Sequence, residues 1–173
     1  MLPMLIFLVL NAINFGYFFL VALNLAAAPR SGAEYCILGS STPGNLTLPA
    51  AGPSTTATSV SYLVYQDMTG ALFNPTSATV QVCSQIVGLN NSGTSTETAK
   101  CTSFGSGTGS WTPAADPEAP YFVLHRVDVS YTFSPLVQGT IFNAPLVAAS
   151  VCSSSSGSVS CTFHRQVSMR AMN

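Results

Sequence analysis

Five cysteines have the most distinctive chemistry in this sequence, and their spacing favours disulfides over metal binding. They stand at Cys36, Cys83, Cys101, Cys152 and Cys161. None lies in a C-x-x-C motif, which argues against a zinc or redox site. The short separations favour a Cys152–Cys161 bridge, which would staple a hairpin with the tip SSSSGSVS, and a Cys83–Cys101 bridge. Five buried free thiols are the alternative, but the chain has the features of an exported protein, where disulfides persist.

The two histidines and the few acidic residues offer little for catalysis. His125, Asp128 and a serine could form a triad, but serine is so common here that its proximity to a histidine means little. The sequence contains no G-x-S-x-G, H-E-x-x-H or P-loop motif. We expect His125 and His164 to be strand residues near each other in a sheet, and Asp116 and Glu118 to be solvated turn residues. The sequence therefore predicts no enzyme, no cofactor, no metal and no small-molecule substrate.

Charged side chains are scarce, and this excludes several classes of protein. The 173 residues include five Lys+Arg and six Asp+Glu, so that 6% are charged and 47% are hydrophobic. About 25% charged residues is usual for soluble domains. Nucleic acid is excluded as the main partner because phosphate binding needs clustered basic residues. The apolar content argues against disorder. Such a chain is expected to lie against lipid, against copies of itself, or both.

Residues 1–38 predict one long hydrophobic helix. No charged side chain precedes Arg30. At about 1.5 Å per residue, 28 helical residues span roughly 42 Å, more than the bilayer core of about 30 Å. A secretory signal peptide is the alternative, because Ala26, Ala27 and Ala28 offer a cleavage site. The missing basic n-region, the length of the apolar stretch and Pro29 after the cut favour a retained helix.

We expect this helix to be the surface through which copies of the chain assemble. The large apolar side chains would form a helical core and the small residues would let neighbouring helices approach closely. The residues concerned are Leu2, Leu5, Ile6, Leu8, Val9, Ala12, Ile13, Phe15, Gly16, Phe18, Phe19 and Leu23. Contact with lipid alone is the alternative.

Three asparagines interrupt the apolar helix: Asn11, Asn14 and Asn24. A buried amide side chain destabilises the protein unless it is hydrogen-bonded. The three residues could pair across helices and set their register, as polar seam residues do in coiled coils. Alternatively, each could bond a carbonyl group of its own helix.

Residues 39–173 predict a small α+β head. Residues 55–73 fit a short amphipathic helix that Ser54 or Thr55 would cap. Three segments alternate as strands, so that they predict an antiparallel sheet with one face covered by the two helices; they are 78–87, 121–133 and 159–169. Residues 88–120 are rich in Gly, Ser, Thr and Pro and predict a long surface loop anchored by Trp111.

Three stretches together resemble the TadE-like pseudopilins of the tight-adherence (Tad/Flp) branch of type IV pili. The first is the apolar helix, with an aromatic–glycine step at Phe15-Gly16 and an Arg-x-Gly-Ala run at 30–33. The second, VDVSYTFSPL at 127–136, is similar to a strand that ends in an aromatic-x-Pro-Leu turn. The third is VSMR at 167–170, similar to the closing strand. The chain departs from the family at Leu5 and Asn14, where a glutamate is expected.

The resemblance implies a type IV pilin-like fold and a structural role. The chain would be anchored in the inner membrane and handled by pilus assembly machinery, and then packed as a homo-oligomer into an extracellular filament for adhesion or surface attachment. A helix without charge favours such packing, because no carboxylate has to be buried and paired. The alternative is a membrane-anchored surface binding domain, or a minor pseudopilin, that does not itself form the filament.

Overall fold

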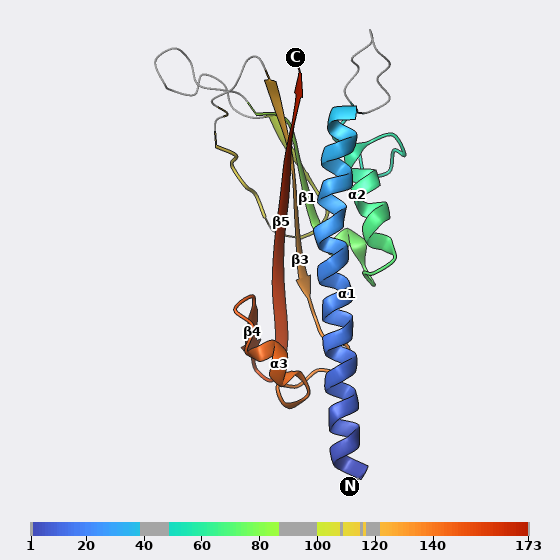
Figure 1. The fold of residues 1–173 in the computed structure, drawn as a ribbon, viewed down its shortest axis with the longest axis vertical. Helices are drawn as coiled ribbons and strands as arrows, with labels where there is room; N and C mark the ends of the chain where they lie inside the picture. The colour runs from blue at the N-terminus through green and yellow to red at the C-terminus, as the bar shows by residue number, and fades with distance from the viewer. Residues whose placement is uncertain are drawn as a thin grey trace.

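The computed structural model describes residues 2–38, 49–86, 100–107, 109–114, 116 and 122–172. Within these residues a long helix precedes a five-stranded antiparallel sheet of order β2-β1-β3-β5-β4 (Figure 1). The elements are α1 (Leu2–Leu38), α2 (Val60–Thr69), the 3₁₀ turn η1 (Pro75–Ser77), β1 (Thr79–Ile86), β2 (Lys100–Phe104), β3 (Phe122–Phe133), the 3₁₀ turn η2 (Ile141–Asn143), α3 (Ala144–Val147), β4 (Cys152–Ser155) and β5 (Ser158–Met172). This α+β layout, with an apolar N-terminal helix, is consistent with a pilin-like arrangement.

The helix α1 is continuous through Pro29, and its C-terminal half belongs to the core of the head. It contacts α2 on one side and β3 and β5 on the other. Its buried apolar side chains recur every three to five residues, so that they form one stripe: Val21, Leu25, Ala28, Ala33 and Cys36. Gly32 lies in the same stripe, where an added Cβ would be 2.5 Å from Cγ2 of Val64. The absence of a side chain therefore lets α1 and α2 pack closely.

The amphipathic helix predicted at 55–73 is present as α2 but is shorter. Its N-cap is Ser59, whose Oγ accepts a hydrogen bond from the backbone N–H of Tyr62 at 3.2 Å. Ser54 and Thr55, which the sequence suggested as caps, lie in the turn before it. Ser59 is the better cap because the apolar spacing that packs on α1 begins at the next residue.

The three predicted strands form the centre of the sheet as β1, β3 and β5, and two edge strands were not predicted. β2 lies inside the segment 88–120 that composition assigned to a loop. β4 is the first arm of the hairpin that ends at Cys161. Both edge strands are short and rich in polar residues, so they lack the alternation that identifies a half-buried strand.

Candidate assembly surface and buried charge cluster

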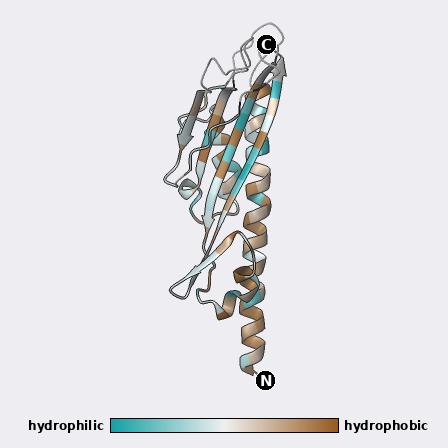
Figure 2. Ribbon diagram, turned by 90° about the vertical axis from the view of Figure 1, so that its left-hand side faces the viewer, coloured by the Kyte–Doolittle hydropathy of each residue, from teal (hydrophilic) through white to brown (hydrophobic). Residues whose placement is uncertain are grey.

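Eleven of the twelve α1 residues expected to form the assembly surface are exposed in the single chain. They are Leu2, Leu5, Ile6, Leu8, Val9, Ala12, Ile13, Phe15, Gly16, Phe19 and Leu23. Leu2 is 76% exposed, and Phe19 and Leu23 are each 56% exposed. Figure 2 shows hydrophobic colouring over this part of the helix. The residues therefore form an apolar surface that nothing in the described chain covers.

The opposite face of α1 packs against the sheet, so the exposed apolar surface lies on one side of the helix at this level. Phe18 belongs to this opposite face, although the sequence placed it with the assembly residues. Its ring is half-buried and packs against Phe133 and Phe163, with ring centroids 5.6 Å and 5.2 Å apart. From Phe15 to Leu23 one face of α1 is thus held by the sheet while the other remains bare.

Among the described residues, α1 is the one helix long and apolar enough to cross a membrane. A signal sequence near an N-terminus can meet the same criteria of length and hydropathy. The helix therefore indicates either membrane anchoring or a signal sequence.

The three asparagines of α1 fall into two groups. The side-chain amides of Asn11 and Asn24 donate to the carbonyl groups of Phe7 and Leu20, both at 2.9 Å, so each bonds its own helix. The buried Oδ1 of Asn11 has no hydrogen-bond partner in the described part of the chain. Bonding within the helix was one of the two alternatives for these residues.

Asn14 follows neither alternative, because it binds a segment more than 120 residues away in the same chain. Its Nδ2 donates to the carbonyl of Val137 at 2.9 Å, to Oδ1 of Asn143 at 2.8 Å and to the carbonyl of Phe142 at 3.3 Å. Its Oδ1 accepts from the backbone N–H of Val137 at 3.1 Å. Asn14 is 1% exposed. We call this contact with residues 137–143 the Asn14 clasp; pairing across helices is wrong for this residue.

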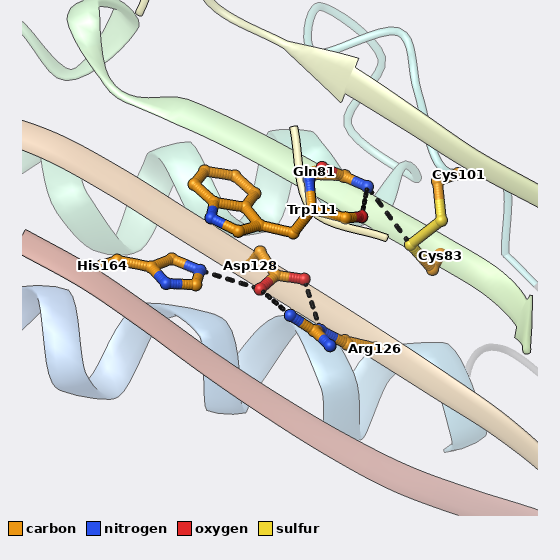
Figure 3. Close-up of a disulfide and its surroundings, with 7 residues drawn as sticks. All are labelled: Gln81, Cys83, Cys101, Trp111, Arg126, Asp128 and His164. Carbon is orange, nitrogen blue, oxygen red and sulfur yellow. Dashed lines mark hydrogen bonds and ion pairs between the residues drawn. A yellow bond between two sulfur atoms is a disulfide. The ribbon is translucent and has the colours of Figure 1, made fainter. Parts of the chain in front are cut away.

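A buried charge cluster lies on the face of the sheet that points away from α1 (Figure 3). Both oxygens of Asp128 are bonded by the guanidinium of Arg126 at 2.7 Å, and Oδ1 also contacts Nε2 of His164 at 2.9 Å. The Asp128 side chain is fully buried. Removing one partner from such a pair leaves an uncompensated buried charge and destabilises a protein by about 3–5 kcal/mol. Arg126 and Asp128 both belong to β3, so the contact of this cluster between β3 and β5 is the one from Asp128 to His164.

The loop around Trp111 covers this cluster, as the sequence anticipated for that residue. The indole stacks on the ring of His164, with centroids 4.2 Å apart and planes 6° apart. The side chain of Gln81 on β1 donates to the carbonyl of Trp111 at 2.7 Å and accepts from its N–H at 2.8 Å. These contacts pin the loop to the sheet and bury the Asp128 carboxylate (Figure 3).

The structure does not assemble the triad that the sequence allowed. His125 and Asp128 are three residues apart on β3 and so point to opposite faces. The register pairs His125 with Met169 and Ser130 with His164, so the two histidines are not neighbours either. Neither ring nitrogen of His125 has a hydrogen-bond partner among the described residues. Burial lowers the pKa of this imidazole below 6.5.

The expectation that Asp116 is a solvated turn residue is also wrong. Asp116 is 2% exposed, and its carboxylate accepts two hydrogen bonds from Arg170 of β5, at 2.9 Å and 3.2 Å. Glu118 lies outside the described residues. The sequence signal for both charge pairs was alternation: Arg126 and Asp128 share one face of their strand, and His164 and Arg170 share one face of theirs.

The two disulfides favoured by spacing are present, and each joins directly opposed residues of an edge strand and its neighbour. Cys83 pairs with Cys101 between β1 and β2, and Cys152 pairs with Cys161 between β4 and β5. Cys36 is a buried free thiol. The disulfides fix the short strands at both edges of the sheet and suggest an extracellular location.

Comparisons with protein-family models, with curated proteins and with solved structures find no match for this chain.

Proposed function

We propose that the chain is a structural subunit that polymerises through α1 into an extracellular type IV pilus-like filament. The observation that carries the proposal is the two-faced character of α1. One face forms the core of the head, whereas the other is apolar and bare from Leu2 to Leu23. In the filament the bare faces would pack together and the heads would form the outer wall.

The size of the bare surface supports assembly with several neighbours. Nine large apolar side chains of the assembly surface are about half exposed or more: Leu2, Leu5, Ile6, Leu8, Val9, Ile13, Phe15, Phe19 and Leu23. Full burial of such a side chain contributes about 1.5–3 kcal/mol, so covering the exposed parts contributes on the order of 10 kcal/mol. Association itself costs about 4–15 kcal/mol. Coverage from several sides is therefore needed, as in a helical bundle of many copies.

The core of the head supports retention of α1 rather than its removal as a signal peptide. Cleavage after Ala28 would remove Val21 and Leu25, which are 0% and 1% exposed, and Phe18, which packs on the sheet. The apolar face of the sheet would then lose its cover. Before assembly the same helix would anchor the subunit in the inner membrane, and the assembly machinery would move it into the filament.

A membrane-anchored surface domain that does not polymerise is the second candidate. The length and hydropathy of α1 favour it, because they suffice for a membrane span without any helix–helix contact.

Substitutions at Gly16 separate these two functions. An added Cβ at Gly16 meets nothing within 4 Å, and the same is true at Gly70, the C-cap of α2. Both positions should therefore accept a side chain without loss of the fold. We expect Gly16→Leu to stay in the membrane and Gly16→Glu to place a charge in the apolar surface, and both to abolish filaments. Gly70→Leu and Gly70→Glu are the matched controls and should assemble normally.

The measurement is electron microscopy of material sheared from cells, with this chain identified in the same fraction by mass spectrometry. Normal filaments from both Gly16 variants would refute assembly through this face of α1. Wild-type chain found in the membrane fraction without fibres would instead support the second candidate.

A further inference from the structure

The head has its own exposed apolar surface, and it is concentrated around α1. Outside α1, the large hydrophobic residues that are exposed in the described chain are Phe73, Leu136, Ile141, Val147 and Val151, with exposures from 41% to 78%. We call these five residues the basal collar. Phe73 lies beside Tyr17 of α1, and Phe142, next to Ile141, lies beside Phe7, with ring centroids 5.4 Å and 6.3 Å apart. The collar segments therefore flank α1 at the level of residues 7–17, and Figure 1 shows α3 beside this lower part of the helix.

The segments that build this end of the molecule carry no charged side chain. No Asp, Glu, Lys or Arg occurs before Arg30, and none occurs between Asp128 and Arg165. The second stretch contains four of the five collar residues. Transfer of this surface into a less polar environment would therefore not require the burial of an ionised group.

Side-chain amides satisfy several backbone groups of the irregular segment 135–143. The Asn14 clasp bonds both backbone groups of Val137. Asn143 donates to the carbonyls of Val137 and Gly139, at 2.9 Å and 2.7 Å, and Gln138 donates to the carbonyl of Pro135 at 3.1 Å. Irregular backbone is tolerated at membrane depth only where its polar groups are satisfied in this way.

The extent of the bare face of α1 along the helix axis indicates that lipid covers the basal collar. This face continues past Asn14 to Leu23, which is nine residues or about 14 Å further along the helix axis. The collar lies below Leu23. A bilayer that covers the bare face of α1 must therefore cover the collar as well.

We propose that the basal collar is embedded in the outer leaflet of the bilayer when the subunit is membrane-anchored, a state that rests on the proposed function. The lower end of the head is then immersed at the boundary of acyl chains and headgroups. Assembly of the filament has to extract the collar from lipid together with α1.

The test uses the full chain in phosphatidylcholine vesicles at a low protein-to-lipid ratio, with and without phosphatidylcholine brominated on its acyl chains. Trp111 is the only tryptophan of the chain and supplies the background emission from the polar face of the sheet. The probe variant is Ile141→Trp, and Val147→Trp is a second probe in case the first misfolds. Gln66→Trp is the matched control, since this exposed residue lies two positions after Val64, which faces Gly32.

We expect brominated lipid to remove most of the emission added at positions 141 and 147 and little of that added at position 66. Equal quenching at all three positions in vesicle-bound chain would overturn the collar proposal alone. The tryptophans at positions 141 and 147 could instead become shielded from solvent only at a high protein-to-lipid ratio, without quenching by brominated lipid. In that case a second copy of the chain covers the collar, which would also overturn the proposal. Failure of the wild-type chain to bind vesicles would overturn both the collar proposal and the membrane step of the proposed function.

Discussion

Replacing Asn14 with leucine removes the Asn14 clasp between α1 and residues 137–143. The size of the resulting loss of stability follows from the contacts. The amide nitrogen reaches three acceptors, on Val137, Phe142 and Asn143, and the amide oxygen accepts from Val137. Because an amide has only two N–H donors, the clasp amounts to about three full hydrogen bonds. At about 1 kcal/mol each, with a further cost for the unpaired groups left behind, the expected loss is about 3–4 kcal/mol.

Asn24→Leu is the matched control, because it makes the same change on the same helix. The amide of Asn24 bonds only the carbonyl of Leu20, which already belongs to the hydrogen-bond ladder of α1. Its loss should change stability by less than about 0.5 kcal/mol. Leucine keeps the branching of asparagine at Cγ but is the larger side chain, so overpacking at the buried Asn14 site adds to the expected loss of stability.

Hydrogen exchange of the full chain in detergent micelles, read by mass spectrometry on peptides covering 135–151, measures the loss locally. A loss of about 3 kcal/mol should speed exchange of the protected amides in this segment roughly 100-fold. Exchange in Asn14→Leu that is no faster than in Asn24→Leu would refute the reasoning. It would show that residues 137–143 are held by their own contacts rather than by α1.

Two further predictions concern the core. Gly32→Val should lower the stability of the fold by about 1–3 kcal/mol, because its Cβ would lie 2.5 Å from Cγ2 of Val64. Gly16→Val is the control and should leave the stability unchanged. Equal thermal midpoints of the two variants in detergent would contradict the close packing of α1 and α2. Burial lowers the pKa of His125 below 6.5, so the folded chain binds this proton less readily than the unfolded chain. The stability that is present above pH 6.5 should therefore fall as the pH drops through that value. His125→Phe should reduce this pH dependence in urea unfolding measured from about pH 8 to about pH 5. An unchanged pH profile in the variant would show that other groups cause the dependence.

The elements with a strong local pattern were predicted from the sequence. A stretch of 29 residues without charge defines α1. Alternating side chains define β1, β3 and β5, because successive residues of a strand face opposite sides. The two short cysteine separations identified both disulfides, because they are compatible with neighbouring strands.

The candidate site was predicted only in part. Twelve residues were named for the assembly surface from their apolar character or small size, and the structure leaves all of them exposed except Phe18. The same character could not distinguish Phe18, which the sheet half-buries, from Phe19 one residue later. That distinction depends on which face of α1 meets β3 and β5.

The sequence alone determined the long apolar helix, the central strands, the paired cysteines and the scarcity of charge, because each is a local property of composition or periodicity. Only the tertiary structure decided the partners of the polar residues. Asn14 bonds a segment 123 residues away, and Asp128 bonds His164, 36 residues away. Strand register and helix rotation bring these groups together, and both arise from long-range packing that no local pattern records.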